Sequence, residues 1–286
     1  ITAVFGLTPM MQTPAHALSW GVAAAGVVQL AWMVWHTRRA GWMPTLVRPH
    51  MTDDVTSLLK RIAPVAVGAG IYQINLLVDM AIASMLPAGA ISYLFYADRL
   101  HQLPVGVIGV AVGTALLPLL ARQISAGENE AALASQNRAL EFALLLTLPA
   151  AAALIIMPDT ILQVLFERGA FTSDATQKTA SALAMFSLGL PAYVIIKALA
   201  PGFFSRGDTA TPIKIGALCL VVNLVLNLLL MEPFQHVGIA AATVSASWVN
   251  AGLLTWVLIR RGHFSFDGRF KARVPRQLLA TAGMAG

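Results

Sequence analysis

Long apolar runs separated by short polar stretches extend over the whole chain. Within each run, apolar residues occupy every position around a helix, and Asp and Glu are almost absent from its centre. A helix needs roughly 20 apolar residues to cross a bilayer, and helices that are apolar all round are typical of lipid-packed bundles. The pattern therefore predicts an all-α, polytopic membrane helix bundle. The expected spans are residues 15–35, 63–86, 90–121, 138–157, 175–204, 211–231 and 237–259, and an eighth begins near 277.

Two connections between these spans are longer than turns. Residues 125–140 are polar, and we expect a helix along the cytoplasmic face before the chain re-enters the membrane. Residues 158–173 contain an apolar stretch too short to span, which predicts a short interfacial helix on the outer face. Since the remaining loops are short, we expect no soluble catalytic domain and no enzyme.

Composition and charge further restrict the class of protein to which the chain can belong. The chain is 57% hydrophobic and 11% charged, with a mean hydropathy of +0.72, so it has more apolar surface than a soluble domain can bury. A net charge of +6 raises nucleic acid as a partner. Its placement argues against this, because fifteen of the 19 Lys and Arg residues lie in alternate connections and only Arg168 and Lys178 lie in the others. That asymmetry predicts a multi-pass membrane protein with the cation-rich side cytoplasmic.

A charge inside an expected span is the strongest candidate for a binding residue. Arg99 lies about 15 Å into the third span at 1.5 Å per residue, and charges at such depth are kept where they face a cavity or a partner. Its planar donors suit phosphate oxygens, so one interpretation is an anionic substrate. The other is a buried ion pair with Asp98 or Asp79 that only joins helices.

Neighbouring residues add to this candidate site. Gln102 lies on nearly the same helix face as Arg99, and Pro104 removes a backbone donor, which predicts a hinge. Lys197, in the fifth span, either faces the cavity or extends toward the interface. The spacing of Gly106, Gly109 and Gly113 predicts the close approach of another helix.

A second group of polar residues suggests an ion site. Asp79 lies inside the second span, and Asn223 and Asn227 are four residues apart on one face of the sixth. Carboxylate and amide oxygens could bind a small hard cation such as sodium; alternatively, the amides bridge neighbouring helices. The six histidines have no metal-ligand spacing on one helix, and the lone Cys219 is expected to be a packing residue.

Three runs closely resemble the MurJ/MviN family of lipid II flippases in order and spacing. They are ISYLFYADRLHQLPVGVIGVAVGTALLPLLAR (91–122), LFERGAFTSDAT (165–176) and KALAPGFFSRGDTATPIKI (197–215). The resemblance extends over essentially the whole chain, and the run IAPVAVGAGIYQINLLVDMAIASML (62–86) is similar to the start of that family's second lobe.

The resemblance implies a domain organisation. The family belongs to the multidrug/oligosaccharidyl-lipid/polysaccharide exporter superfamily, with two six-helix lobes around a central cavity and two added helices. The chain would then run from about the sixth helix to the start of the thirteenth. Residues 1–36 would end the first lobe, 37–61 form a cytoplasmic linker, 62–261 form the second lobe, and 262–286 form a cytoplasmic loop and the start of an additional helix.

The resemblance also implies roles for individual residues. Asp98 and Arg99 match the family's cavity motif, so Arg99 would meet a lipid-linked pyrophosphate. Some members have Glu where Gln102 stands, which leaves a carboxylate role there in doubt. A sodium site of the family matches the three polar residues above together with Thr243 and the backbone of Ile239. One ligand that can be Asp is Asn227 here, which would weaken ion binding.

The function implied is the movement of undecaprenyl-pyrophosphate-linked disaccharide pentapeptide, lipid II, from the inner to the outer leaflet. It would proceed by alternating access through a cationic cavity, in a monomer surrounded by membrane lipids, without a cofactor other than a coupling sodium ion. The alternatives are a flippase for another polyprenyl-pyrophosphate-linked saccharide and a multidrug or cation antiporter of the same superfamily. A membrane-embedded transferase would need clustered carboxylates or a metal site, which the sequence does not offer.

Overall fold

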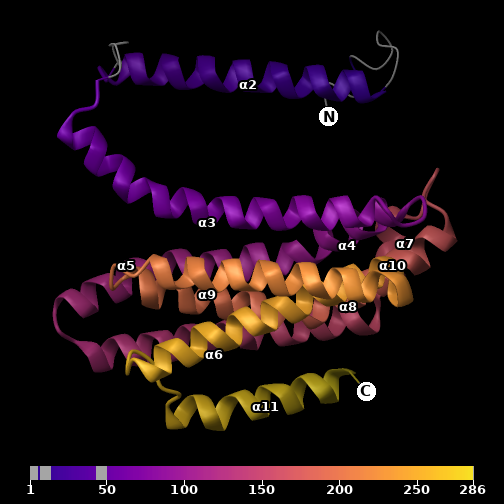
Figure 1. Cartoon of the computed structure of the whole chain (residues 1–286). Helices are drawn as coiled ribbons and strands as arrows, with labels where there is room; N and C mark the ends of the chain where they lie inside the picture. The colour runs from indigo at the N-terminus through magenta and orange to yellow at the C-terminus, as the bar shows by residue number, and fades with distance from the viewer. Residues whose placement is uncertain (1–5, 7–13, 43–49, 286) are drawn as a thin grey trace. The chain divides into compact units, whose positions relative to one another are not determined.

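The computed structural model describes residue 6, residues 14–42 and residues 50–285. Every element within these residues is helical, which confirms the all-α expectation. Five helical stretches of the described chain are long and apolar enough to cross a membrane. The elements (Figure 1) are α2 (Pro14–Arg39), α3 (Asp53–Ala83), α4 (Ala90–Pro104), the π-helix η2 (Val105–Val110), α5 (Ala111–Ser125), α6 (Asn129–Ile156), α7 (Pro158–Phe166), α8 (Ser173–Leu188), α9 (Leu190–Phe204), α10 (Ala210–Arg260) and α11 (Gly268–Ala285).

The chain divides into two compact units, residues 1–56 and residues 57–286. In the first unit, α2 matches the expected span 15–35, and its apolar side chains are largely exposed, as suits a helix surrounded by lipid. Near its end, the guanidinium of Arg39 lies 4.4 Å from the ring centroid of Trp35. An Arg and a Trp together at a helix end are typical of the membrane interface.

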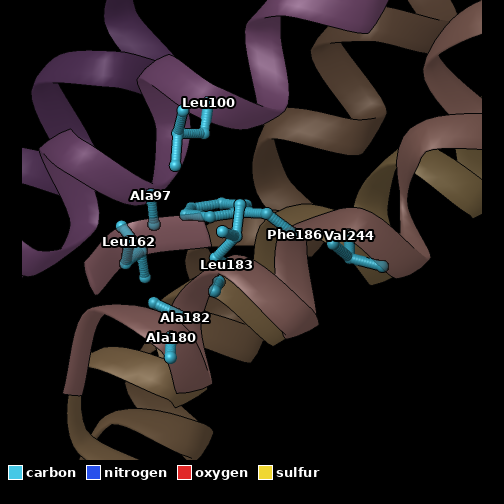
Figure 2. Packing of buried hydrophobic residues seen from close by; sticks show 9 residues of the cluster. Ala97, Leu100, Leu162, Ala180, Ala182, Leu183, Phe186 and Val244 are labelled. Atoms are coloured by element: carbon cyan, nitrogen blue, oxygen red, sulfur yellow. The ribbon is translucent and has the colours of Figure 1, made fainter. Parts of the chain in front are cut away.

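The second unit is a bundle with two main apolar clusters. In one, Figure 2 shows Ala97 and Leu100 of α4 facing Leu183 and Phe186 of α8, and Leu162 of α7 completes the contact. The other lies between α6, α9 and α10, around the buried Phe203, Cys219 and Phe264. Cys219 is a free, buried packing residue, as expected.

The expected outer connections meet at one end of this unit. Tyr93 lies beside His236, with ring centroids 5.5 Å apart, and Tyr96 contacts Phe166 and Phe171 at 5.0 and 5.2 Å. The cation-rich connections meet elsewhere: Arg261 donates to Asp208 at 2.5 Å, and Asn137 of α6 donates to the carbonyl of Ser265. Which of the two groups is cytoplasmic stays a prediction.

The two expected spans 211–231 and 237–259 are two helices that together make up α10, separated by a sharp reversal of the chain. Gln235 has φ 51° and ψ −130°, far from helical values. Beyond it the chain folds back, because Asn223 donates to the hydroxyl of Thr243 and Gly238 lies against the carbonyl of Leu230. The expectation of two spans is therefore correct, joined by a tighter turn than a loop.

Two expected boundaries are wrong. The helix α3 begins at Asp53, well before the expected span 63–86; Thr52 caps the backbone N–H of Val55, and the helix continues through Pro64. The linker role of residues 37–61 stays a prediction. The separate helix expected over 125–140 is instead the start of the 28-residue α6, whose Ala-rich first turns favour one helix. The expected span 175–204 agrees with a single stretch long and apolar enough to cross a membrane, residues 173–204, within which α8 and α9 meet at Gly189, just before Pro191.

Candidate substrate and ion sites

The helix α4 presents Arg99 on the side opposite its packed face. Ala97 and Leu100 are buried against α7 and α8, whereas Arg99 is exposed. The guanidinium carbon of Arg99 lies 4.9 Å from the ring centroid of Phe95, one turn earlier. Among the described residues, no carboxylate lies within 4.0 Å of the Arg99 guanidinium. The ion pair with Asp98 or Asp79 that the sequence left open is therefore not formed.

Asp98 has other neighbours on the same helix. Its carboxylate accepts a hydrogen bond from the side-chain amide of Gln102, and Oδ1 lies 3.8 Å from Nδ1 of His101. The structure thus brings Asp98 and Gln102 together, while the guanidinium of Arg99 lies over the ring of Phe95. That these three residues contact a substrate stays a prediction.

The turn after Pro104 departs from α-helical geometry. Residues Val105–Val110 form a π-helix, in which the missing proline N–H is accommodated by wider hydrogen bonding. Such insertions often occur at functional sites, although the hinge role of Pro104 stays a prediction.

Lys197 of α9 lies across this part of the bundle. A Cβ placed on Gly109 would lie 2.7 Å from Cδ of Lys197, and one on Gly113 would lie 3.2 Å from its backbone oxygen. These two glycines therefore allow the close helix approach that their spacing predicts. The expectation is wrong for Gly106, which has open space around it. Lys197 is half-buried, and its role stays open.

The oxygen-rich residues expected to bind sodium converge from α3 and both halves of α10. Asn227 Nδ2 donates to Asp79 Oδ1 at 2.6 Å and to Asn223 Oδ1 at 2.9 Å. The Thr243 hydroxyl contacts Asp79 Oδ2 at 3.2 Å and the carbonyl of Ile239 at 3.0 Å. We call these five residues the oxygen cluster; the structure brings them together, and ion binding by them stays a prediction.

One buried oxygen of the oxygen cluster is available to a cation. Asn227 is fully buried, and its side-chain oxygen Oδ1 has no hydrogen-bond partner among the residues that the structure describes. A buried acceptor without a partner is uncommon and costs about 1–3 kcal/mol. A cation would satisfy this oxygen together with the carboxylate of Asp79.

Sequence reasoning missed two buried polar residues. Glu141, at the start of an expected span, accepts a hydrogen bond from Arg273 at 2.5 Å and lies 3.7 Å from both Arg138 and Arg269. It thereby holds α11 against α6. His101 is one of the six histidines without metal-ligand spacing, but its i, i+3 spacing from Asp98 indicates a possible contact between the two side chains.

The comparison with protein families gives one match over the full chain. A family model described as "Lipid II flippase MurJ" matches residues 1–286. Among curated relatives, a "Probable lipid II flippase MurJ" from Rhizobium meliloti (strain 1021) is 49% identical over 271 residues, covering 94% of this chain and 50% of that protein. One from Rhizobium tropici is 46% identical over 282 residues, covering 99% and 52%. The chain thus spans about half the length of these relatives.

Solved structures show the same likeness. A chain described as "Lipid II flippase MurJ, inward closed conformation" superposes with a TM-score of 0.71 at 27% identity, covering 83% of this chain and 49% of that one. A multidrug resistance transporter of the MATE family, in an outward-facing conformation, gives a TM-score of 0.63 at 17% identity, covering 79% of this chain and 53% of that one. The second likeness concerns the fold alone.

Proposed function

The chain belongs to the lipid II flippase MurJ family, and from this premise we propose that it forms part of a transporter that moves lipid II across the cytoplasmic membrane. The chain is a multi-pass protein of that membrane. The apolar surface of its helices is compatible with the lipid tail, whereas the charged, sugar-bearing head group needs a polar route. An alternating-access cavity lined in part by Arg99 would supply that route.

The observation that carries this proposal is that Arg99, ten residues into the stretch 90–125 that is long enough to span, is exposed and has no carboxylate partner among the described residues. An arginine used only to join helices would be buried against a carboxylate. Here the guanidinium keeps its donors available, and its fork matches the oxygens of a diphosphate two at a time. The ring of Phe95 supports the guanidinium without neutralising it.

The membrane potential supplies a driving force for this direction of transport. A diphosphate head group carries about two negative charges, and an inside-negative potential favours its outward movement by roughly 4–5 kcal/mol per 100 mV. The empty transporter must then return. Sodium binding to the oxygen cluster is the proposed resetting step, because it would stabilise one arrangement of α3 against α10.

Replacement of Arg99 tests the substrate role. In cells depleted of their own lipid II flippase, we expect Arg99→Ala to abolish growth and lower outer-leaflet lipid II at least tenfold. Arg99→Lys should retain partial transport, since an ammonium keeps the charge but loses the paired donors.

Arg122→Ala is the matched control, because Arg122 is also exposed but lies at the cation-rich end of α5. It removes the same charge and should leave transport near the unmodified level. Normal growth with Arg99→Ala at equal membrane abundance would remove Arg99 from the mechanism. Undiminished outer-leaflet lipid II in cells lacking every other flippase and this protein would defeat the function itself.

A further inference from the structure

The side chain of His101, on α4, is buried, with only 4% of the residue exposed. Within the part of the chain that the structure describes, neither Nδ1 nor Nε2 has a hydrogen-bond partner. Either neutral form of imidazole carries one N–H donor and one acceptor nitrogen. Burying both without partners is unfavourable, so packing alone is a poor reason for a histidine at this position.

The ring of His101 lies between two aromatic side chains and close to one carboxylate of its own helix. From α8, Phe186 stacks on the ring at 5.6 Å between centroids, and from α9, Tyr193 meets it edge-on at 4.8 Å. Figure 2 places Phe186 within the apolar cluster beneath α4. On α4 itself, Asp98 Oδ1 lies 3.8 Å from Nδ1. Hydrogen bonds of this kind are about 2.8–3.0 Å long, so a shift of about 1 Å completes one.

We propose that His101 is a positioning residue: its Nδ1–H holds the Asp98 carboxylate on the packed side of α4, away from Arg99, so that the guanidinium stays free for the diphosphate. This inference rests on the proposed function, which it deepens. Asp98 and Arg99 are adjacent in sequence, and a carboxylate turned toward Arg99 would neutralise it. Gln102 already donates to Asp98 from one side, and His101 supplies the second donor on the buried side.

Two substitutions at position 101 distinguish a positioning role from a packing role, because each role predicts that a different one of the two variants keeps function. His101→Asn keeps a donor nitrogen near the position of Nδ1 but loses the ring. His101→Phe keeps a ring against Phe186 and Tyr193 but loses the donor. If His101 positions Asp98, Asn preserves function and Phe impairs it; if His101 only packs, the order reverses.

The measurement is the affinity of the purified protein in lipid nanodiscs for lipid II and for undecaprenyl diphosphate, which lacks sugars and peptide. We expect His101→Phe to weaken binding of both about tenfold and His101→Asn to stay within about twofold of the unmodified protein. Because His101 acts on ligand binding by positioning the Asp98 carboxylate, adding His101→Phe to Asp98→Asn should cause no further loss of affinity.

Each outcome bears on the proposal. Equal binding by His101→Phe and the unmodified protein, or an additive loss in the Asp98→Asn background, would overturn it. A His101→Phe variant with lowered thermal stability is still informative, since the comparison within the Asp98→Asn background cancels a general packing defect. Failure of the underlying function is recognised separately, because then neither ligand binds and Arg99→Ala changes nothing.

Discussion

Among the members of the oxygen cluster, only Asp79 carries a formal negative charge. Asn227 stands beside it with two donated hydrogen bonds and a buried oxygen that accepts none. The amide therefore performs two tasks at once, because its nitrogen bridges Asp79 and Asn223 while its oxygen is available to a cation. Hard cations bind more tightly as carboxylates replace neutral oxygens. The strength of an ion site here thus depends on the residue at position 227.

Asn227→Asp should increase sodium affinity about tenfold, because it adds a carboxylate where the amide stands. Without sodium the variant should be less stable than the unmodified protein, since two donors to Asp79 and Asn223 are replaced by a second negative charge. Melting temperature measured against sodium chloride, with choline chloride at matched ionic strength, reports both effects.

Asp79→Asn serves as the opposite variant and should lose the sodium-dependent rise in melting temperature. If its melting temperature rises with sodium as much as that of the unmodified protein, the oxygen cluster is a set of hydrogen bonds between helices and binds no ion.

At the scale of elements, the reversal inside α10 brings Thr243 opposite Asn223 and so assembles the four members of the oxygen cluster that α10 supplies. Gly238 makes this reversal possible. A Cβ there would lie 2.1 Å from the backbone oxygen of Leu230, and a backbone atom cannot move aside without shifting its helix. His236 fixes the same turn, with Nε2 2.9 Å from the carbonyl of Lys178.

Gly238→Ala should therefore destabilise the protein by about 1–3 kcal/mol and also weaken sodium binding. Thermal unfolding of the purified protein measures the first effect. Gly252→Ala is the matched control in the same element, because no atom outside its own helix lies within 4 Å of the added Cβ. That control should be neutral or slightly stabilising, as alanine is the better helix former; equal behaviour of the two variants would contradict the close approach.

The attachment of α11 depends on Glu141, whose side chain is only 10% exposed while its arginine partners Arg269 and Arg273 are about half exposed. Removal of its charge leaves those guanidinium groups without a buried partner. We expect Glu141→Gln to weaken the attachment by about 1–2 kcal/mol and to accelerate amide hydrogen exchange in residues 268–285. Glu130→Gln, on an exposed part of α6, should leave exchange unchanged. Unaltered exchange in Glu141→Gln would show that apolar packing alone holds α11.

At the scale of the whole molecule, a hydrogen-bonded ion pair outside the spans joins two distant connections. Asp208, between α9 and α10, accepts from the backbone N–H of Thr211 at 2.9 Å and from Arg261, at the end of α10, at 2.5 Å. Partial burial opposes ionisation of Asp208, but the hydrogen bonds from Thr211 and Arg261 outweigh it and lower the pKa of the carboxyl below its ordinary value of 3.8. The ionised form is thus favoured by folding.

Because the folded-state pKa is the lower one, this stabilisation is fully present above pH 3.8 and is lost as the pH falls through the folded value. Melting temperature should therefore fall more steeply with acid in the unmodified protein than in Asp208→Asn, and the two curves should converge at the lowest pH. Asp159→Asn, at an exposed position on α7, is the control and should follow the unmodified curve. Parallel curves for Asp208→Asn and the unmodified protein would mean that the pair adds nothing to stability.

The sequence by itself determined the class of the protein, the spans and the grouping of the connections. Hydropathy and helix propensity act within about 20 residues, so α2, α4 with α5, and the two halves of α10 follow from local pattern. One boundary was predicted wrongly where that pattern gives no signal, because α6 has no helix breaker between its polar start and its apolar part. Arg99 stood out because a deep charge is costly wherever its helix is placed.

Only the tertiary structure decided how these residues are used. Asp79 and Asn227 are 148 residues apart, and no local rule specifies their contact; Ile239 and Thr243 entered the expected ion site through family resemblance alone. The roles of Glu141 and His101 depend on contacts with residues of other helices, α11 for Glu141 and α8 and α9 for His101. Side-chain partners depend on how each helix is rotated in the bundle, and that rotation is fixed by packing between distant segments rather than by any one of them.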